Sequence, residues 1–136
     1  MMMPQPAPIG EAHQPSSSSM LNDIPAADVF ICCGYTDMRL QINGLAAIVQ
    51  QVFKLDPCSR SLFLFCGRRS DRMKALYFEG DGWLLLYKRL ERGRYQWPRK
   101  ESEARKLTPQ QLRWLLEGLS IEQPKAIRNV GSVLVI

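Results

Sequence analysis

The sequence is poor in the side chains that bind transition metals. Its only histidine is His13, and its four cysteines, Cys32, Cys33, Cys58 and Cys66, form no C-x-x-C motif. A structural zinc site needs about four ligands, usually arranged in two closely spaced pairs. We therefore expect no metal site and no cofactor, and we interpret three of the cysteines as small buried hydrophobic residues.

Recognisable catalytic motifs are also missing. No histidine lies in the patterned part of the chain, and there is neither a G-x-S-x-G elbow nor a phosphate-binding glycine loop. A nuclease or a transposase would need two or three carboxylates converging on a divalent metal. The central region offers only Asp71, Glu79, Asp81 and Glu91, of which most suit turns or strand ends. We predict no catalytic residues and no enzymatic activity. The alternative is a cryptic enzyme, which three carboxylates clustered around one point in the structure would support.

No long apolar segment is present. Spanning a bilayer takes roughly 18 to 20 consecutive apolar residues, and no run in the chain approaches that length. The N-terminal stretch MMMPQPAPIG lacks both the positive and the apolar region of a secretory signal. We expect a soluble protein of the reducing cytoplasm that has no membrane partner.

What the chain does have is a size and an apolar content that suit one domain. It contains 136 residues, of which 46% are hydrophobic. Residues 1–27 are rich in proline, serine, glutamine and alanine, and we predict that they form a disordered tail. We assign residues 28–125 to a single α+β domain and residues 126–136 to a C-terminal tail.

The positive charge is concentrated in the middle of the chain. The formal net charge is +5, but residues 60–106 alone hold thirteen basic and six acidic residues, a local excess of +7. A basic band of this kind attracts polyanions, of which nucleic acid is the most common. It is equally compatible with a solvated surface that keeps a small protein soluble.

The N-terminal half of the domain predicts a strand followed by a helix. The apolar run at residues 29–33 ends at Gly34 and suits a strand that enters a turn. We expect Thr36 to cap a helix that stops before Pro57. One face of this helix would be buried, because apolar residues recur at helical spacing: Met38, Ile42, Leu45, Val49 and Val52.

The C-terminal half predicts a meander of strands and a second helix. Residues 61–66 suit a strand buried on both faces, and the glycine-rich segment 79–82 suits a hairpin between strands 73–78 and 83–90. A third turn at 92–94 would lead to a strand at 95–97. Thr108 would cap a helix with an apolar stripe of four leucines, Leu112, Leu115, Leu116 and Leu119. The order favours an α+β fold, an antiparallel sheet of about four to five strands with two helices packed on one face.

Basic and aromatic residues alternate through the predicted hairpins. The candidate nucleic-acid-binding residues are Arg68, Arg69, Arg72, Lys74, Lys88, Arg89, Arg92 and Arg94. They are interleaved with Tyr77, Phe78, Trp83, Tyr87, Tyr95 and Trp97. Arginines at the ends of two adjacent hairpins could hold phosphates. The alternative is that the aromatic residues form the sheet core and the basic residues its polar rim.

Three segments carry a resemblance to a known family. They are CGYTDMRLQINGLAAIVQ (33–50), LFLFCGRRSDRMKALYFEGDGWLLLYKRLERGRYQWP (62–98) and LTPQQLRWLLEGL (107–119). Together they resemble the small accessory protein called TnpB of the IS66 group of bacterial insertion sequences. The resemblance implies a gene beside a transposase gene and a second small accessory gene, with all three products serving transposition. It implies no particular biochemical act for this component.

Two hypotheses follow for that act. In the first, the basic hairpins hold DNA at the transposon ends for the transposase. In the second, the protein is an adaptor that docks on the transposase or the second accessory protein without binding DNA. The adaptor would use the helix predicted at residues 36–53 or the leucine stripe, and its candidate partner-binding residues are Asp37, Arg39 and Trp114.

Overall fold

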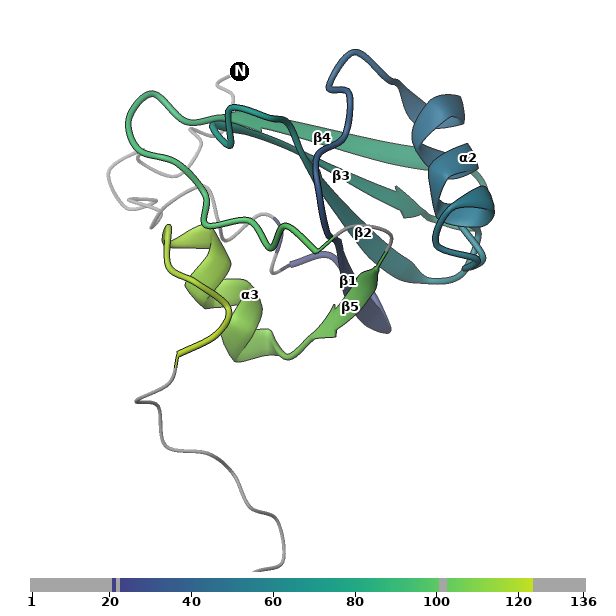
Figure 1. The fold of residues 1–136 in the computed structure, drawn as a ribbon. Helices are drawn as coiled ribbons and strands as arrows, with labels where there is room; N and C mark the ends of the chain where they lie inside the picture. The colour runs from purple at the N-terminus through teal and green to yellow at the C-terminus, as the bar shows by residue number, and fades with distance from the viewer. Residues whose placement is uncertain (1–20, 22, 101–102, 124–136) are drawn as a thin grey trace, which may run out of the picture.

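A computed structural model of the chain describes residues 21, 23–100 and 103–123 (Figure 1). Its elements follow in the order β1 (Asp28–Cys32), α2 (Ile42–Gln51), β2 (Ser61–Cys66), β3 (Arg72–Phe78), β4 (Trp83–Arg89), β5 (Ala104–Leu107) and α3 (Pro109–Leu116). The strands form one sheet in the order β4-β3-β2-β1-β5. The predicted α+β class is confirmed.

The sheet is antiparallel except at one pair of strands. Each of β2, β3 and β4 is antiparallel to the one before it, which confirms the predicted antiparallel order of these three strands and the hairpin at residues 79–82. β1 pairs with β2 in parallel. The connection that contains α2 returns the chain to the end of the sheet at which β1 begins, so β2 runs in the same direction as β1. β5 then pairs with the free edge of β1 in the antiparallel sense.

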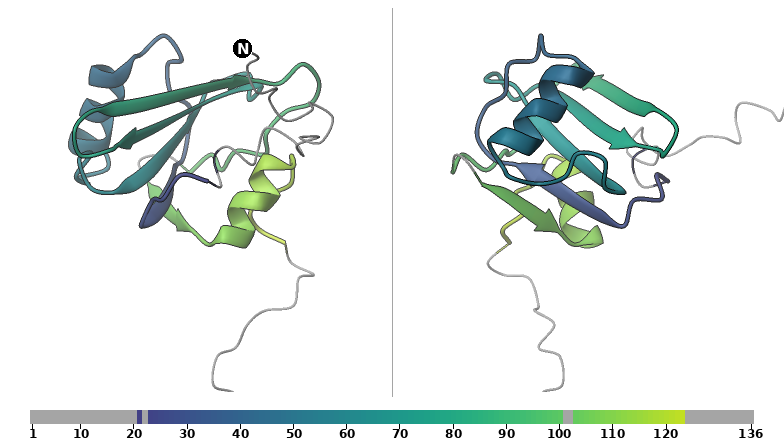
Figure 2. Two further views of the ribbon diagram at one scale, coloured as in Figure 1. Left: turned by 180° about the vertical axis from the view of Figure 1, so that it is seen from behind. Right: turned by 90° about the vertical axis from the view of Figure 1, so that its right-hand side faces the viewer.

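The two helices cover opposite faces of the sheet. Side chains along β2 alternate: Phe63 and Phe65 pack with Leu45 and Val49 of α2, whereas Leu62, Leu64 and Cys66 pack with the leucines of α3. Figure 2 shows α2 and α3 on either side of the sheet. The expectation that both helices share one face was therefore wrong, because a central strand with apolar residues at every position needs a cover on each face.

The first helix starts later than predicted. Thr36 does not cap it, because the helix begins six residues further on; the backbone N–H of Thr36 donates to the carbonyl of Cys66 at 2.9 Å and holds the chain against the end of β2. A turn follows, closed by the N–H of Leu40 on the carbonyl of Asp37 at 3.1 Å. α2 begins only at Ile42, and Gln41 at its N-cap makes no side-chain capping bond.

The strand predicted at residues 95–97 does not form. The N–H of Tyr95 donates to the carbonyl of Ser70 at 2.7 Å, and the indole of Trp97 donates to the carbonyl of Cys32 at 2.9 Å. Both side chains are buried on the α3 face of the sheet. The segment 91–100 is therefore an irregular strap, pinned by its aromatic residues, that carries the chain across the sheet to β5.

The start of α3 is confirmed in detail. Thr108 and Gln111 form a reciprocal capping box, with both hydrogen bonds at 3.0 Å. The helix ends before Gly118, whose φ of +83° is a conformation that glycine adopts without steric cost. Leu112, Leu115 and Leu116 are buried, but Leu119 lies beyond the helix and is exposed.

Most of the predicted N-terminal tail, and all of the predicted C-terminal tail at residues 126–136, lie outside the described residues. Within the described part, Leu21 and Ile24 pack against the core, and the hydroxyl of Tyr77 donates to the carbonyl of Pro25 at 3.2 Å. The division into tails and domain stays a prediction. Neither helix of the described chain is long and apolar enough to cross a bilayer.

Candidate nucleic-acid interface

Strand pairing brings the β2–β3 loop and the segment after β4 together at one end of the sheet. Arg72 at the start of β3 lies opposite Arg89 at the end of β4. The N–H of Leu90 then donates to the carbonyl of Asp71 at 2.7 Å, so the segment after β4 runs beside the β2–β3 loop. We call the basic residues gathered there the arginine end: Arg68, Arg69, Arg72, Arg89, Arg92 and Arg94.

Four of these arginines extend into solvent. Arg68, Arg69, Arg92 and Arg94 are exposed, and within the described chain none of the four pairs with a carboxylate. Arg72 and Arg89 are partly neutralised, by Asp71 at 3.6 Å and by Glu91 at 3.5 Å. The arginine end thus keeps a positive charge that an anion can meet without first displacing a carboxylate.

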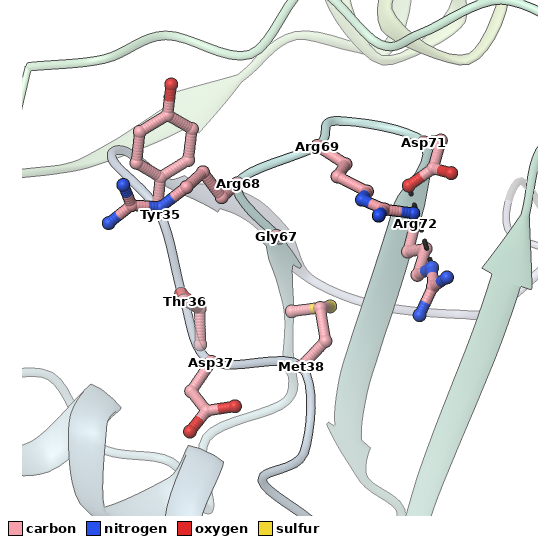
Figure 3. Close-up of a pocket in the computed structure, with 9 residues that line it drawn as sticks. All are labelled: Tyr35, Thr36, Asp37, Met38, Gly67, Arg68, Arg69, Asp71 and Arg72. Atoms are coloured by element: carbon pink, nitrogen blue, oxygen red, sulfur yellow. Dashed lines mark ion pairs between the residues drawn. The ribbon is translucent and has the colours of Figure 1, made fainter.

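A hollow of about 570 Å³ lies beside the β2–β3 loop (Figure 3). Arg68 reaches from the loop toward Tyr35, whereas Arg69 extends toward Asp71 and Arg72. The close packing of Met38 against the backbone in this hollow requires a glycine at position 67, because a Cβ there would stand 2.7 Å from Cγ of Met38. Two arginines of the β2–β3 loop, Arg68 and Arg69, and Arg72 at the start of β3 therefore line a single depression.

Tyr35 and Arg99, which were not predicted from the sequence, also belong to this surface. Tyr35 is 47% exposed, and the guanidinium carbons of Arg68 and Arg99 lie 5.5 and 4.3 Å from the centre of its ring. Tyr35, Arg68, Arg94 and Arg99 also border a second hollow of about 550 Å³ under the strap. The sequence signals for these residues were weak: a tyrosine after a turn glycine, and a basic pair after Pro98.

Lys74, although a candidate from the sequence, does not belong to the exposed surface. It is only 5% exposed, and its Nζ donates to the carbonyl of Leu40 at 2.7 Å. The same ammonium group lies 5.7 Å from the centre of the Tyr87 ring. Lys74 thus ties the turn before α2 to β3. Lys88 points to the opposite face of β4 from Arg89, because neighbouring residues of a strand alternate.

The candidate partner-binding residues are not brought together. Asp37 and Arg39 form an ion pair of their own at 2.9 Å in the turn before α2. Hydrogen bonds from Arg39 hold the pKa of Asp37 down at about 2. Trp114 lies on α3, across the sheet from them. The leucine stripe that the adaptor hypothesis would use is largely buried against the sheet.

Most of the charged side chains of this surface are guanidinium groups. Among residues 21, 23–100 and 103–123, no three histidine, cysteine or acidic side chains stand close enough to hold a metal ion. Burial raises the pKa of the Cys66 thiol to about 12 and also raises the pKa of the Cys32 thiol, so neither thiol is activated as a nucleophile. The surface offers guanidinium groups and one exposed aromatic ring, which suit phosphate and base recognition.

Comparison with known proteins gives relatives but no solved structure. An uncharacterized protein, y4hO, of Sinorhizobium fredii is 42% identical over 97 residues, which span 71% of this chain and 84% of the relative. A second uncharacterized protein of the same organism, y4jC, is 34% identical over 83 residues, which span 61% of this chain and 71% of the relative. No solved structure matches the chain.

The family model that matches is described as IS66 Orf2-like protein, and it covers residues 27–126. This range includes every strand and both helices of the fold. It also includes the whole arginine end and Tyr35. The resemblance seen in the sequence is thereby confirmed. The chain belongs to the IS66 Orf2-like family, whose members are accessory proteins of insertion sequences with a role in transposition and are not a known enzyme class.

Proposed function

We propose that this protein binds DNA at or near the ends of its insertion sequence, through the arginine end. The observation that carries the proposal is the convergence of six arginines, from two connections and two strand ends, on one end of the sheet. Four of them are exposed and have no carboxylate partner in the described chain. The transposase and the second accessory protein would then act on DNA that this protein holds.

The physical argument is electrostatic. Each phosphate neutralised by an arginine releases condensed counterions, so the logarithm of the binding constant falls with the logarithm of salt by about 0.9 per phosphate. Guanidinium groups suit this task because their planar donors can bind a phosphate through two parallel hydrogen bonds. Contacts of this kind fix where the protein sits on DNA but do not read its sequence.

The test is a salt titration of binding to labelled duplex DNA from the element's ends and to a scrambled duplex. Arg68→Ala/Arg92→Ala removes two exposed charges from the arginine end. Arg60→Ala/Arg113→Ala is the matched control, because it removes two exposed arginines that lie elsewhere. We expect the first variant to lower the salt slope by about two and the control to leave it unchanged.

Binding that is absent at moderate salt, or that does not weaken as salt rises, would contradict the proposal. Equal losses in the two variants would also contradict it, because the effect would then follow net charge rather than position. In either case the adaptor hypothesis gains, and capture of purified transposase by this protein becomes its direct test. The ratio of affinities for the end duplex and the scrambled duplex measures sequence preference separately.

A further inference from the structure

A third hollow extends the surface around the end of the sheet. It has a volume of about 460 Å³ and lies on the α2 face, where Lys74, Leu85 and Tyr87 line it. It shares Met38 and Arg72 with the hollow beside the β2–β3 loop. That hollow in turn shares Tyr35 and Arg68 with the one under the strap. The three hollows therefore adjoin one another, and we call them together the basic groove.

Two exposed tyrosines stand along the basic groove. Tyr35 is 47% exposed and Tyr87 is 53% exposed, whereas Tyr77, Tyr95 and Trp97 are buried. Each exposed ring lies near cationic groups, Tyr35 with Arg68 and Arg99 and Tyr87 with Lys74. Neither ring contributes to the core, so packing does not account for an aromatic residue at these two positions.

The basic groove has a net positive charge. Its three carboxylates each pair with a base of the groove: Asp37 with Arg39 at 2.9 Å, Asp71 with Arg72 at 3.6 Å and Glu122 with Arg105 at 2.7 Å. Arg68, Arg69, Arg94 and Arg99 are left without a carboxylate in the described chain. An extended polyanion could therefore follow the groove from one tyrosine to the other.

The geometry points to single-stranded DNA as the ligand of the basic groove, an inference that rests on the proposed function and narrows it. A duplex presents phosphates but keeps the faces of its bases stacked inside, whereas a single strand offers both. The groove passes from the α2 face around the end of the sheet to the strap. Such a bent path suits a flexible strand better than a duplex, which resists bending over about 150 base pairs.

The experiment compares binding of labelled oligothymidylate of about 15 nucleotides and of duplex DNA of the same length. It uses the full chain at one salt concentration. The variant Tyr35→Leu/Tyr87→Leu removes both rings, and Tyr35→Phe/Tyr87→Phe is its matched control. We expect the wild type to prefer the single strand, the leucine variant to bind it at least tenfold more weakly, and the phenylalanine variant to bind within about twofold of wild type. Ultraviolet crosslinking followed by mass spectrometry should place the adducts on Tyr35 and Tyr87.

The outcomes separate this inference from the proposed function. Salt-dependent duplex binding with weaker binding of the single strand would overturn the inference and leave the proposed function standing. Crosslinks confined to residues outside the groove, or a leucine variant that binds as wild type does, would overturn it as well. If neither nucleic acid binds, both the inference and the proposed function fail.

Discussion

Lys74 and Arg69 lie five positions apart on one hairpin and carry the same charge, but the fold gives them opposite roles. Arg69 is exposed in the β2–β3 loop. Lys74 is buried on β3, where its ammonium group donates to the carbonyl of Leu40. A buried ammonium that satisfies a backbone carbonyl stabilises the fold, because removing it leaves that carbonyl without a partner.

Alanine substitution at Lys74 should therefore lower stability without changing DNA binding, and alanine substitution at Arg69 should weaken DNA binding with little change in stability. Lys74→Ala should lower the free energy of unfolding by about 2 kcal/mol, since it removes a buried stem and a hydrogen bond, and should leave the salt slope of duplex binding unchanged. Arg69→Ala should change stability by less than about 0.5 kcal/mol and lower the slope by about one. Urea denaturation and the salt titration measure the two quantities. A lower slope in Lys74→Ala would place Lys74 back among the DNA contacts.

At the scale of elements, the two helices show when local sequence is sufficient. The start of α3 is encoded within four residues, because Thr108 and Gln111 satisfy each other's backbone N–H groups. Before α2, the path of the chain depends on a distant contact, because the carbonyl of Cys66, 30 positions away, accepts the N–H of Thr36. A local capping signal is therefore not sufficient where tertiary contacts set the path of the chain before the helix.

Removing the capping box should loosen α3. Thr108→Ala leaves the N–H of Gln111 without its acceptor and should cost about 1 kcal/mol of the free energy of unfolding. Thr108→Ser is the control, because it keeps a hydroxyl acceptor and should lose only a small part of that amount. Equal losses in the two variants would mean that the methyl group of Thr108, and not its capping bond, matters.

β5 is a strand that the sequence pattern did not predict. Its four residues, ARKL, are short and mostly polar, and nothing in their pattern alternates strongly. They form a strand because β1 leaves one edge free, and the register sets Val29 opposite Leu107. The segment 95–97 resembled a strand more closely, yet its two aromatic residues, Tyr95 and Trp97, anchor the strap.

At the scale of the whole molecule, burial on both faces of the sheet determines which thiols can react. Cys32, Cys33 and Cys66 are buried on the sheet, whereas Cys58 is exposed in the turn before β2. Burial also raises the pKa of each of the three buried thiols, which suppresses the reactive thiolate. The fold therefore separates one accessible thiol from three protected ones.

Thiol labelling should report this separation directly. With an aromatic disulfide reagent, the native protein should release one equivalent rapidly, and Cys58→Ser should abolish that phase. The other three thiols should react at a rate set by opening of the sheet, and unfolding in urea should make all four react rapidly. Two or more fast thiols in the native protein would contradict the burial of β1 or β2.

Apolar periodicity, turn residues and capping signals determined, from the sequence alone, the class of fold, the central buried strand, the hairpin at residues 79–82 and the start of α3. The sequence also placed the positive charge in the hairpins. These features depend on residues a few positions apart. Only the tertiary structure decided that the helices lie on opposite faces, that Lys74 is buried, and that Tyr35 lies between Arg68 of the arginine end and Arg99. Each of these depends on contacts between segments distant in the chain, where burial and free strand edges outweigh local preference.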